Sequence, residues 1–361
     1  MHSAEEKKGR RGQRKTRRVT MTDIAREAGC SQATVSFVLN QTDGVSISSE
    51  MRTRVIEVAR ALDYSPSNLT ALLRPKAVGT TEGTIGFLVD QLATSPEAAI
   101  AIDSARQEAW RTGNIIVSAQ TMSDPVMEPR AIETLLSLGV SAIIYMTIIT
   151  RELQPHKLLR ELDIPLVLLN CYTADHAFRA VIPSEIAGGQ SATRHLIEHG
   201  HRRVATILGE TWMDAASSRL EGYRRALATA DIPFDPKLVV QGDWSTTGGY
   251  EATRKLLALK HRPTAIFCQN DRTAVGCYDA LREAGLSIPG DVSVVGYDDE
   301  EISRHLRPRL TTCILPHRAM ASWAIEHLQE SRPRDARRHP ITKIECPLVS
   351  RDSVAAPKPG R

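Results

Sequence analysis

Residues 23–40 read DIAREAGCSQATVSFVLN and contain two short amphipathic helical patterns joined by AGCS. The preceding TMTD fits a capping box, in which Thr20 caps the helix amides and Asp23 lies at the third helical position. Gly29 predicts a helix C-terminus because glycine adopts a positive φ at little cost, and Ser31 predicts the cap of a second helix. The segment therefore predicts a helical hairpin, which is either buried in a larger core or used to read DNA.

The first turn of the second predicted helix is SQAT (31–34), which carries short polar side chains. At such an N-terminus the helix amides and dipole face phosphate, and short side chains can reach base edges in a major groove. A third helix follows, with apolar residues at helical spacing from Met51 to Leu62, and it ends before Pro66. Three helices in this arrangement favour a helix-turn-helix domain over a plain buried hairpin.

Here the sequence resembles the LacI family of transcription regulators. The resemblance runs from Val19 to about Ser353 and rests on several motifs in the right order. They are VTMTDIAREAGCSQATVSFVLN (19–40), RVIEVARALDYSPSN (54–68), QNDRTAVG (269–276) and DVSVVGYDDEE (291–301). The resemblance implies a sequence-specific DNA-binding regulator, a repressor, of carbohydrate metabolism genes.

The resemblance also implies DNA-binding roles for individual residues. Backbone phosphates would be bound by Thr20, Thr22, Ser31, Thr34, Ser36, Asn40 and Ser48. The base-reading positions hold Gln32, Ala33 and Phe37, and the expected DNA contacts further include Tyr64 and Asn68. In the simpler interpretation, several of the hydroxyls only cap helices.

Phe37 departs from the family pattern, which frequently places Arg at this position. Arg donates two hydrogen bonds to guanine, whereas Phe offers only apolar contact, for instance to a thymine methyl group. The alternative is that Phe37 packs against its own domain. In both cases the guanine contact is lost, so we expect an operator that departs from the family consensus at that base pair.

SPSNLTALLRP (65–75) is a short segment bounded by prolines. The resemblance implies a hinge helix that folds when two subunits pair over the minor groove, with Leu73 as the wedge between base pairs. An isolated helix this short is unstable in water, so a plain linker is the alternative. Ser67, Ala71 and Pro75 depart from the usual hinge pattern, which leaves phosphate contacts from these positions open.

From residue 83 onward, apolar runs of strand length alternate with amphipathic helical patterns. Strands are expected over 84–90, 114–120, 141–148, 164–170, 203–209, 264–270 and 292–298, and helices over 97–112, 186–199, 217–230, 247–259 and 272–285. This alternation predicts parallel sheets with helices on both faces. The resemblance implies two periplasmic-binding-protein-like lobes. The first would hold roughly 81–200 and a helix near 316–331, and the second 201–314 and a strand near 341–352.

The expected fold class is an N-terminal all-α helix-turn-helix domain plus hinge helix, followed by an α/β two-lobed periplasmic-binding-protein-like domain. The expected order is a basic flexible tail (1–18), the helix-turn-helix domain (19–66), hinge helix and linker (67–80), the two-lobed effector-binding and dimerisation domain (81–353) and a flexible tail (354–361). Residues 1–80 carry 14 Lys and Arg against 8 Asp and Glu, whereas the remainder carries 32 against 34. The basic N-terminal part suggests a polyanionic partner.

Ligands of open α/β sheets bind beyond the carboxyl ends of the strands, which places an effector in the cleft between the lobes. From the second lobe, the expected effector contacts are Arg219, Trp244, Asn270 and Asp298, because guanidinium, aromatic, amide and carboxylate groups suit a sugar. From the first lobe they are Thr94, Ser95, Gln120 and Tyr145.

Neighbouring residues are given other roles. Asp271 and Asp299 are expected to be structural, in a helix N-cap and a turn. Pro183-Ser184 stands where the family usually has an acidic or amide pair, and QLATSPEAA (91–99) lacks a frequent aromatic pattern. We therefore expect an effector other than the best-known family sugars.

Several functional classes are disfavoured by the sequence. The six cysteines are scattered without a CxxC pair, which argues against a disulfide framework and a zinc site and favours a reduced cytoplasm. No run of 18 apolar residues and no signal-peptide core occurs, so neither a membrane span nor export is expected. GxSxG, GxxxxGK[ST] and HExxH are absent, and RHLIEHGH (194–201) lies at a predicted helix end before a strand, where His and Gly commonly end helices, with no Cys nearby. We expect no enzyme, no cofactor and no metal.

The expected partners are double-stranded operator DNA and a small effector, which is a sugar, sugar acid or sugar phosphate. No heptad pattern follows Ser353, so a homodimer is expected, with a tetramer as the alternative. The expected location is the cytoplasm, on the nucleoid. The alternative function is a cytoplasmic sugar-binding or sugar-processing protein with a basic tail, but such a protein has no need of a helix-turn-helix and hinge.

Overall fold

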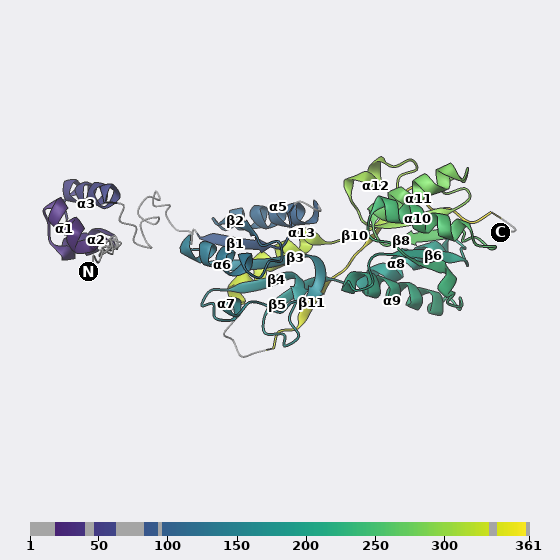
Figure 1. Cartoon of the computed structure of the whole chain (residues 1–361), viewed down its shortest axis with the longest axis horizontal. Helices are drawn as coiled ribbons and strands as arrows, with labels where there is room; N and C mark the ends of the chain where they lie inside the picture. The colour runs from purple at the N-terminus through teal and green to yellow at the C-terminus, as the bar shows by residue number, and fades with distance from the viewer. Residues whose placement is uncertain (1–18, 40–46, 63–82, 93–95, 332–337, 359–361) are drawn as a thin grey trace, which may run out of the picture. The chain divides into compact units, whose positions relative to one another are not determined.

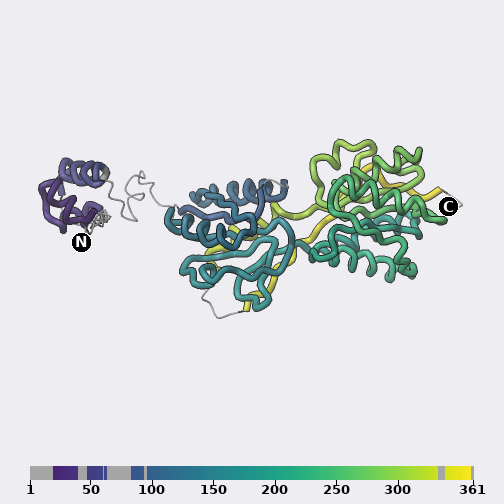
Figure 2. Tube along the Cα trace, in the orientation of Figure 1, coloured from purple at the N-terminus to yellow at the C-terminus, as the bar shows by residue number. Residues whose placement is uncertain are grey.

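A computed structural model describes residues 19–39, 47–62, 83–92, 96–331 and 338–358 of the chain. The chain divides into two compact units between Gly79 and Thr80, drawn as a cartoon in Figure 1 and as a Cα trace in Figure 2. The described part of the first unit is helical, whereas the second contains two sheets and the helices that cover them. No helix among the described residues is long and apolar enough to cross a membrane.

The first unit contains α1 (Met21–Ala28), α2 (Gln32–Leu39) and α3 (Ser49–Ala61). The predicted capping box is present, since the Asp23 amide donates to Thr20 Oγ1 at 3.4 Å and the Thr20 amide to Asp23 Oδ2 at 2.9 Å. Gly29 ends α1 with a φ of 71°, the left-handed conformation that glycine adopts readily. The apolar faces of the helices bury one core, formed by Ile24, Ala25, Ala28, Val35, Val38, Leu39, Val55 and Ala59.

The second unit begins with a lobe that we call the N-lobe. Its sheet has the order β11-β5-β4-β3-β1-β2, and every neighbouring pair is parallel. The strands are β1 (Thr84–Val89), β2 (Ile115–Gln120), β3 (Ala142–Glu152), β4 (Leu166–Tyr172), β5 (Arg179–Pro183) and β11 (Ile341–Ile344). One face is covered by α5 (Pro96–Arg111) and α13 (His317–His327), the other by α6 (Met127–Ser137) and α7 (Lys157–Arg160). All six residues of β1 are buried because helices cover both faces.

The second lobe, the C-lobe, has a sheet of order β12-β10-β9-β8-β6-β7, parallel except for the β10–β12 pair. Its strands are β6 (Val204–Leu208), β7 (Val239–Gln241), β8 (Ala265–Cys268), β9 (Ser293–Asp298), β10 (Thr311–Ile314) and β12 (Leu348–Val349). Helices α10 (Thr246–Leu257) and α11 (Asp271–Glu283) cover one face, and α8 (Glu185–Glu198) and α9 (Asp214–Thr229) the other. The short α12 (Glu301–His305) follows β9, and single 3-10 turns lie at Pro236–Leu238 and Leu328–Glu330.

The chain passes between the lobes three times: between β5 and α8, between β10 and α13, and between β11 and β12. This corrects two expectations about lobe membership. Helix α8 belongs to the C-lobe, because Ala192 and Leu196 share a core with Phe267. The last expected strand is two strands, of which β11 pairs with β5 in the N-lobe and β12 with β10 in the C-lobe.

The seven predicted strands are confirmed as β1, β2, β3, β4, β6, β8 and β9. The structure adds β5, β7 and β10, which have five, three and four residues and which the apolar runs did not single out. The expected class of two α/β lobes after a helical domain is therefore observed, and the additional strands complete both sheets.

Candidate functional site

The first turn of α2 presents the residues expected to read bases. Gln32 and Ala33 are exposed there. The Thr34 amide donates to Ser31 Oγ at 3.0 Å, and the two hydroxyl oxygens lie 2.8 Å apart. The cap satisfies an amide of the helix N-terminus and leaves the Gln32 and Ala33 side chains on the surface.

The other hydroxyls expected at phosphates have capping roles in part. Thr20 belongs to the capping box of α1, and Ser48 Oγ accepts a hydrogen bond from the Met51 amide at 3.3 Å. Thr22 is exposed, and Ser36 is half-buried. Capping is thus observed for Thr20, Ser31 and Ser48, while phosphate binding stays a prediction. Four expected DNA contacts lie outside the described residues: Asn40, Tyr64, Asn68 and Leu73.

Phe37 is half-buried on α2. Among the described residues of the first unit, it belongs neither to the buried core nor to the partly buried side chains packed against that core. This placement favours the interpretation in which Phe37 contacts a partner over the one in which it only packs against its own domain.

A cavity of about 480 Å³ lies between the two lobes of the second unit. Its N-lobe side includes Ile149, Thr150 and Asn170, which lie near the carboxyl ends of β3 and β4. Its C-lobe side includes four expected effector contacts: Arg219, Trp244, Asn270 and Asp298. The cleft expected from the direction of the strands is therefore present, and Thr94 and Ser95 lie outside the described residues.

Arg219 lines the cavity, but the protein already engages its guanidinium. Its Nε donates to Glu185 Oε2 at 2.8 Å, and a terminal nitrogen donates to Glu185 Oε1 at 2.9 Å. The other terminal nitrogen donates to the Gln269 carbonyl oxygen. The guanidinium carbon lies 3.7 Å from the centre of the Tyr297 ring, and the residue is 3% exposed. Arg219 thus links α8 to α9 through contacts within the protein itself.

Asn270 and Asp298 lie at the carboxyl ends of β8 and β9, as expected. Asn270 Oδ1 accepts from the Thr273 amide at 2.9 Å, and its Nδ2 donates to the Trp244 carbonyl oxygen at 3.0 Å. Asp298 Oδ1 is buried without a hydrogen-bond partner among the described residues. Burial raises the pKa of Asp298 well above its usual value, against the lowering effect of Arg219.

The two neighbouring carboxylates are structural, although one expected detail was wrong. Asn270, not Asp271, caps α11. Asp271 is buried, with Thr312 Oγ1 at 2.7 Å and the Glu300 amide at 2.8 Å, and burial raises its pKa to about 8. Asp299 is held by Arg304 at 2.9 Å and by Arg351.

Trp244 forms part of the cavity wall in a constrained conformation. Its φ is 64°, a region that side-chain-bearing residues seldom adopt. A Cβ atom on Gly209 would lie 1.8 Å from the Trp244 ring, so glycine is required for the ring to lie there. Trp244 Nε1 is 2.9 Å from Met213 Sδ. The ring is therefore fixed as an apolar surface, which suits stacking on a sugar.

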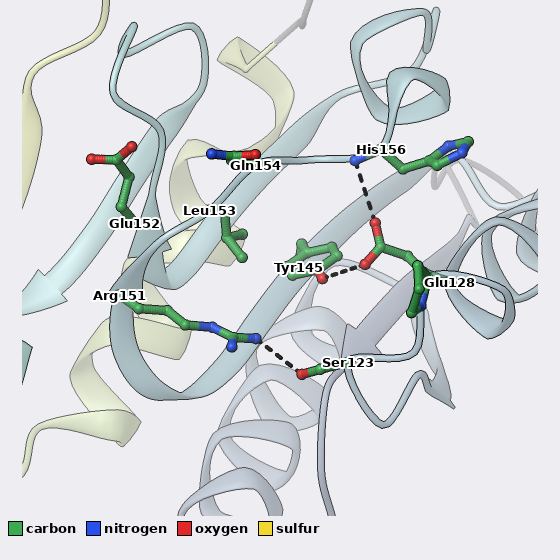
Figure 3. Close-up of a pocket in the computed structure, with 9 residues that line it drawn as sticks. Ser123, Glu128, Tyr145, Arg151, Glu152, Leu153, Gln154 and His156 are labelled. Atoms are coloured by element: carbon green, nitrogen blue, oxygen red, sulfur yellow. Dashed lines mark hydrogen bonds between the residues drawn. The ribbon is translucent and has the colours of Figure 1, made fainter. Parts of the chain in front are cut away.

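Gln120 and Tyr145 do not line this cavity. Strand β3 continues to Glu152, so Tyr145 lies in its middle rather than at its carboxyl end. Its hydroxyl donates to Glu128 Oε2 at 2.8 Å, in a separate pocket of about 300 Å³ (Figure 3). Gln120 ends β2, the outermost strand of the sheet, and its amide donates to Met122 Sδ.

Four glutamates line the cavity that the sequence did not predict: Glu97, Glu185, Glu210 and Glu300. Glu185 directly follows the Pro183-Ser184 departure, so the chain places a carboxylate one position later than the family pattern. That shift in the sequence could have predicted Glu185 as a cavity residue. The position of Glu97 had no such signal, because it depends on how α5 meets the C-lobe.

Comparison with known proteins covers both units. The family description "Bacterial regulatory proteins, lacI family" matches residues 20–67, and "Periplasmic binding protein-like domain" matches residues 193–354. The ribose operon repressor of Haemophilus influenzae is 32% identical over 335 residues, which covers 93% of this chain and 98% of that protein. The transcriptional repressor PurR of Histophilus somni is 31% identical over the same shares of both chains. These relatives are transcription repressors, not enzymes.

Solved structures agree with these matches. The lac repressor dimer bound to operator and the anti-inducer ONPF is 27% identical, with a TM-score of 0.67, over 94% of this chain and 100% of that one. The complex of the regulator CelR with cellobiose is 29% identical, with a TM-score of 0.64, over 93% and 100%. The sequence motifs, the capped α1–α2 pair and the two-lobed unit lead to one conclusion: the chain belongs to the LacI family of bacterial regulatory proteins and is a DNA-binding transcription regulator.

Proposed function

We propose that the protein represses transcription by binding a near-palindromic operator as a homodimer in the cytoplasm, and that a small sugar in the interlobe cavity sets its DNA affinity. The observation that carries the proposal is the combination, in one chain, of an exposed reading turn on α2 and a polar cavity with Trp244 in its wall. A relative named as the ribose operon repressor and a similar transcriptional regulator in complex with cellobiose support it.

Among the three effector classes expected from the sequence, the cavity favours a neutral sugar. Six carboxylates line it against two guanidinium groups, those of Arg219 and Arg272. An additional negative charge on a sugar acid or sugar phosphate would be repelled. Asn270 and Asp298 can bind vicinal hydroxyls, and Trp244 can stack on the apolar face of a sugar ring.

The homodimer is supported by exposed apolar side chains of the N-lobe. Within the described residues, Trp110, Ile115, Met122, Val126 and Met127 are large, apolar and exposed, and they follow one another from the end of α5 to the start of α6. Apolar groups gathered in this way mark association surfaces. Pairing through this face would leave β2 covered rather than open to water.

The effector acts by favouring one arrangement of the two lobes. A ligand shifts such an equilibrium only by its difference in affinity for the two states. Closure of the lobes would change the spacing of the paired N-lobes and so of the two DNA-binding units. We expect sugar binding to release the protein from DNA. A sugar that instead tightened DNA binding would be a corepressor.

The alternative, a sugar-binding or sugar-processing protein with a basic tail, predicts no specific DNA binding. The discriminating experiment is a footprint of the full-length protein on the promoter region of its own gene, with and without a panel of neutral sugars. We expect a protected near-palindrome whose occupancy changes with one of the sugars. Absence of protection under every condition would refute the repressor proposal.

A further inference from the structure

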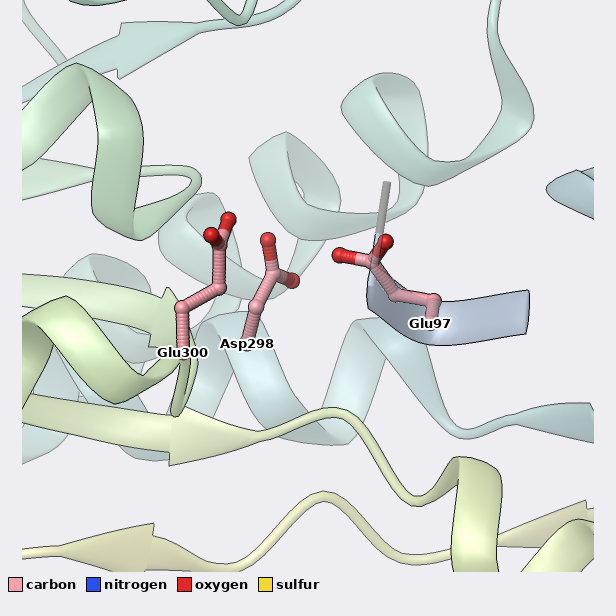
Figure 4. Close-up of side chains that lie close together, drawn as sticks. All are labelled: Glu97, Asp298 and Glu300. Carbon is pink, nitrogen blue, oxygen red and sulfur yellow. The ribbon is translucent and has the colours of Figure 1, made fainter. Parts of the chain in front are cut away.

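Three carboxylates from the two lobes meet inside the interlobe cavity. Glu97 lies in the first turn of α5 in the N-lobe, whereas Asp298 ends β9 and Glu300 follows it in the C-lobe. One oxygen of each lies within 4.8 Å of the corresponding atoms of the other two, and Figure 4 shows the three side chains converging. Like charges this close repel one another, so the arrangement calls for a compensating positive group.

Two of these carboxylates have an oxygen without a partner. Within the described part of the chain, Glu97 Oε2 and Asp298 Oδ1 are buried and accept no hydrogen bond. Glu97 is 9% exposed, and the Asp298 side chain is 10% exposed. A buried carboxylate oxygen without a partner is costly, so a ligand at this point would be stabilising.

The two neighbouring arginines pair with only part of the acidic cluster. Arg219 pairs with Glu185 at 2.8 Å, and Arg272 pairs with Glu300 at 3.1 Å. Arg219 also lies 3.7 Å from Asp298 Oδ1, which is beyond hydrogen-bond distance. Once these two pairs are set aside, Glu97 has no cationic partner among the described residues and Asp298 has only the longer contact with Arg219, so the cluster offers a place for one divalent cation.

We propose that Glu97, Asp298 and Glu300 bind one divalent cation of the oxygen-preferring class, Ca²⁺, Mg²⁺ or Mn²⁺. Carboxylate oxygens are the ligands that these hard cations prefer. Because such a cation takes six or more ligands, its remaining positions face the cavity, where water or effector hydroxyls can fill them. This last role, in effector binding, rests on the proposed function; the cation site itself does not.

The site has a mechanical consequence, because its ligands come from both lobes. A cation held by α5 and by the end of β9 joins the N-lobe to the C-lobe and stabilises their approach. Without it, the facing carboxylates oppose that approach. The cation would therefore shift the same equilibrium that the effector uses.

The test is calorimetric titration of the full-length protein, freed of metal with a chelator, with CaCl₂, MgCl₂ and MnCl₂ in the absence of DNA and sugar. We expect one cation bound per chain, and a loss of affinity of at least about tenfold in Glu97→Gln. Glu301→Gln is the matched control, because it removes an exposed carboxylate next to Glu300 and should bind as the original protein does. The cation should also raise the Tm of the original protein, but not that of Glu97→Gln.

Two results would overturn the proposal. One is the absence of binding by all three cations at millimolar concentration. The other is equal binding by the original protein and Glu97→Gln while both give the same Tm without metal. If an amino sugar binds instead and loses affinity in Glu97→Gln, the cluster takes an ammonium group and the metal site is refuted. Operator binding is measured separately, so a failed footprint rejects the repressor and leaves the cation result standing.

Discussion

Two single residues, Phe37 and Asp271, have surroundings that lead to predictions which the fold class alone does not give. Phe37 lies on the helix that presents Gln32 and Ala33, yet it is absent from the described core of its unit. Asp271 is buried at the start of α11, where its carboxyl group meets Thr312 and the Glu300 amide. We expect Phe37 to influence base preference and Asp271 to influence the pH dependence of stability, and both properties can be measured.

Phe37→Arg should move base preference toward guanine at one position in each half-site. Arg can donate two hydrogen bonds to guanine, worth about 1–3 kcal/mol of discrimination, and Phe cannot. A binding-selection assay on random DNA measures the preference. Glu27→Gln is the control, because it makes the same change in net charge from an exposed position on α1. An unchanged preferred sequence in Phe37→Arg would show that position 37 does not face the bases.

Asp271→Asn should flatten the pH dependence of stability. In the unfolded chain this carboxyl group ionises near pH 3.8, and in the folded protein burial raises its pKa to about 8. Folding therefore favours the protonated form, so the contribution of Asp271 to stability is full below pH 3.8 and declines as the pH rises toward 8.

The measurement is urea unfolding at pH 5 and pH 8. We expect the difference in unfolding free energy between the two values to fall by about 1 kcal/mol or more in Asp271→Asn, since one pKa unit corresponds to about 1.4 kcal/mol. Asp279→Asn, at an exposed position on α11, should retain the original difference. The same pH dependence in both variants would contradict a protonated Asp271.

At the scale of elements, α8 and α9 are joined by a buried ion pair. Arg219 on α9 binds Glu185 on α8 through two hydrogen bonds, and its guanidinium carbon lies 3.7 Å from the centre of the Tyr297 ring. A Cβ on Gly189 would lie 2.4 Å from the Arg219 carbonyl oxygen, so glycine allows the close approach of the two helices. The sequence predicts Arg219 as an effector contact; the structure shows that its side chain joins two helices of the cavity wall.

Arg219→Met should lower the free energy of unfolding by about 3–5 kcal/mol, because Glu185 is left as an unpaired buried charge. The double variant Arg219→Met with Glu185→Met should recover most of that loss. Chemical unfolding of the single and double variants measures the coupling. Arg106→Met, which breaks an exposed pair with Asp103, should cost less than about 1 kcal/mol. A similarly small cost for Arg219→Met would show that the pair adds little to stability.

At the scale of the whole molecule, the second unit is two sheets whose strands direct their carboxyl ends toward one cavity. The lobes also contact each other through the Tyr172 hydroxyl, which donates to Asp214 Oδ2 at 2.9 Å. Exposed apolar residues follow the outer strand of the N-lobe, where we propose that a second copy pairs. The proposed effector cavity and the proposed pairing face thus lie in different parts of this unit.

Trp110→Lys should weaken the dimer by at least about 2 kcal/mol, because a large aromatic residue at an interface is commonly a main source of binding energy. Sedimentation over a range of concentrations measures the dissociation constant. Trp212→Lys is the matched control: Trp212 is 65% exposed against 71% for Trp110, but it lies in the C-lobe. Equal effects of the two substitutions would reject the N-lobe face as the interface.

The local features of this protein could be predicted from its sequence. The capping box, the end of α1 at Gly29 and the seven predicted strands depend on residues within a few positions of one another, and the structure confirms them. The likeness of the DNA-binding motifs was also visible in the sequence, and the family comparison confirms it. The placement of Asn270 and Asp298 followed from the direction of parallel strands.

Only the tertiary structure decided which distant residues meet. The lobe to which α8 belongs, the pairing of Arg219 with a glutamate 34 positions away and the exclusion of Tyr145 from the cavity all depend on sheet order and strand length. Glu97 joins Asp298 and Glu300 because the first turn of α5 and the end of β9, which belong to different lobes, meet at the same cavity. Short-range patterns reflect local propensity and burial, whereas these contacts arise from packing between lobes, which no local pattern encodes.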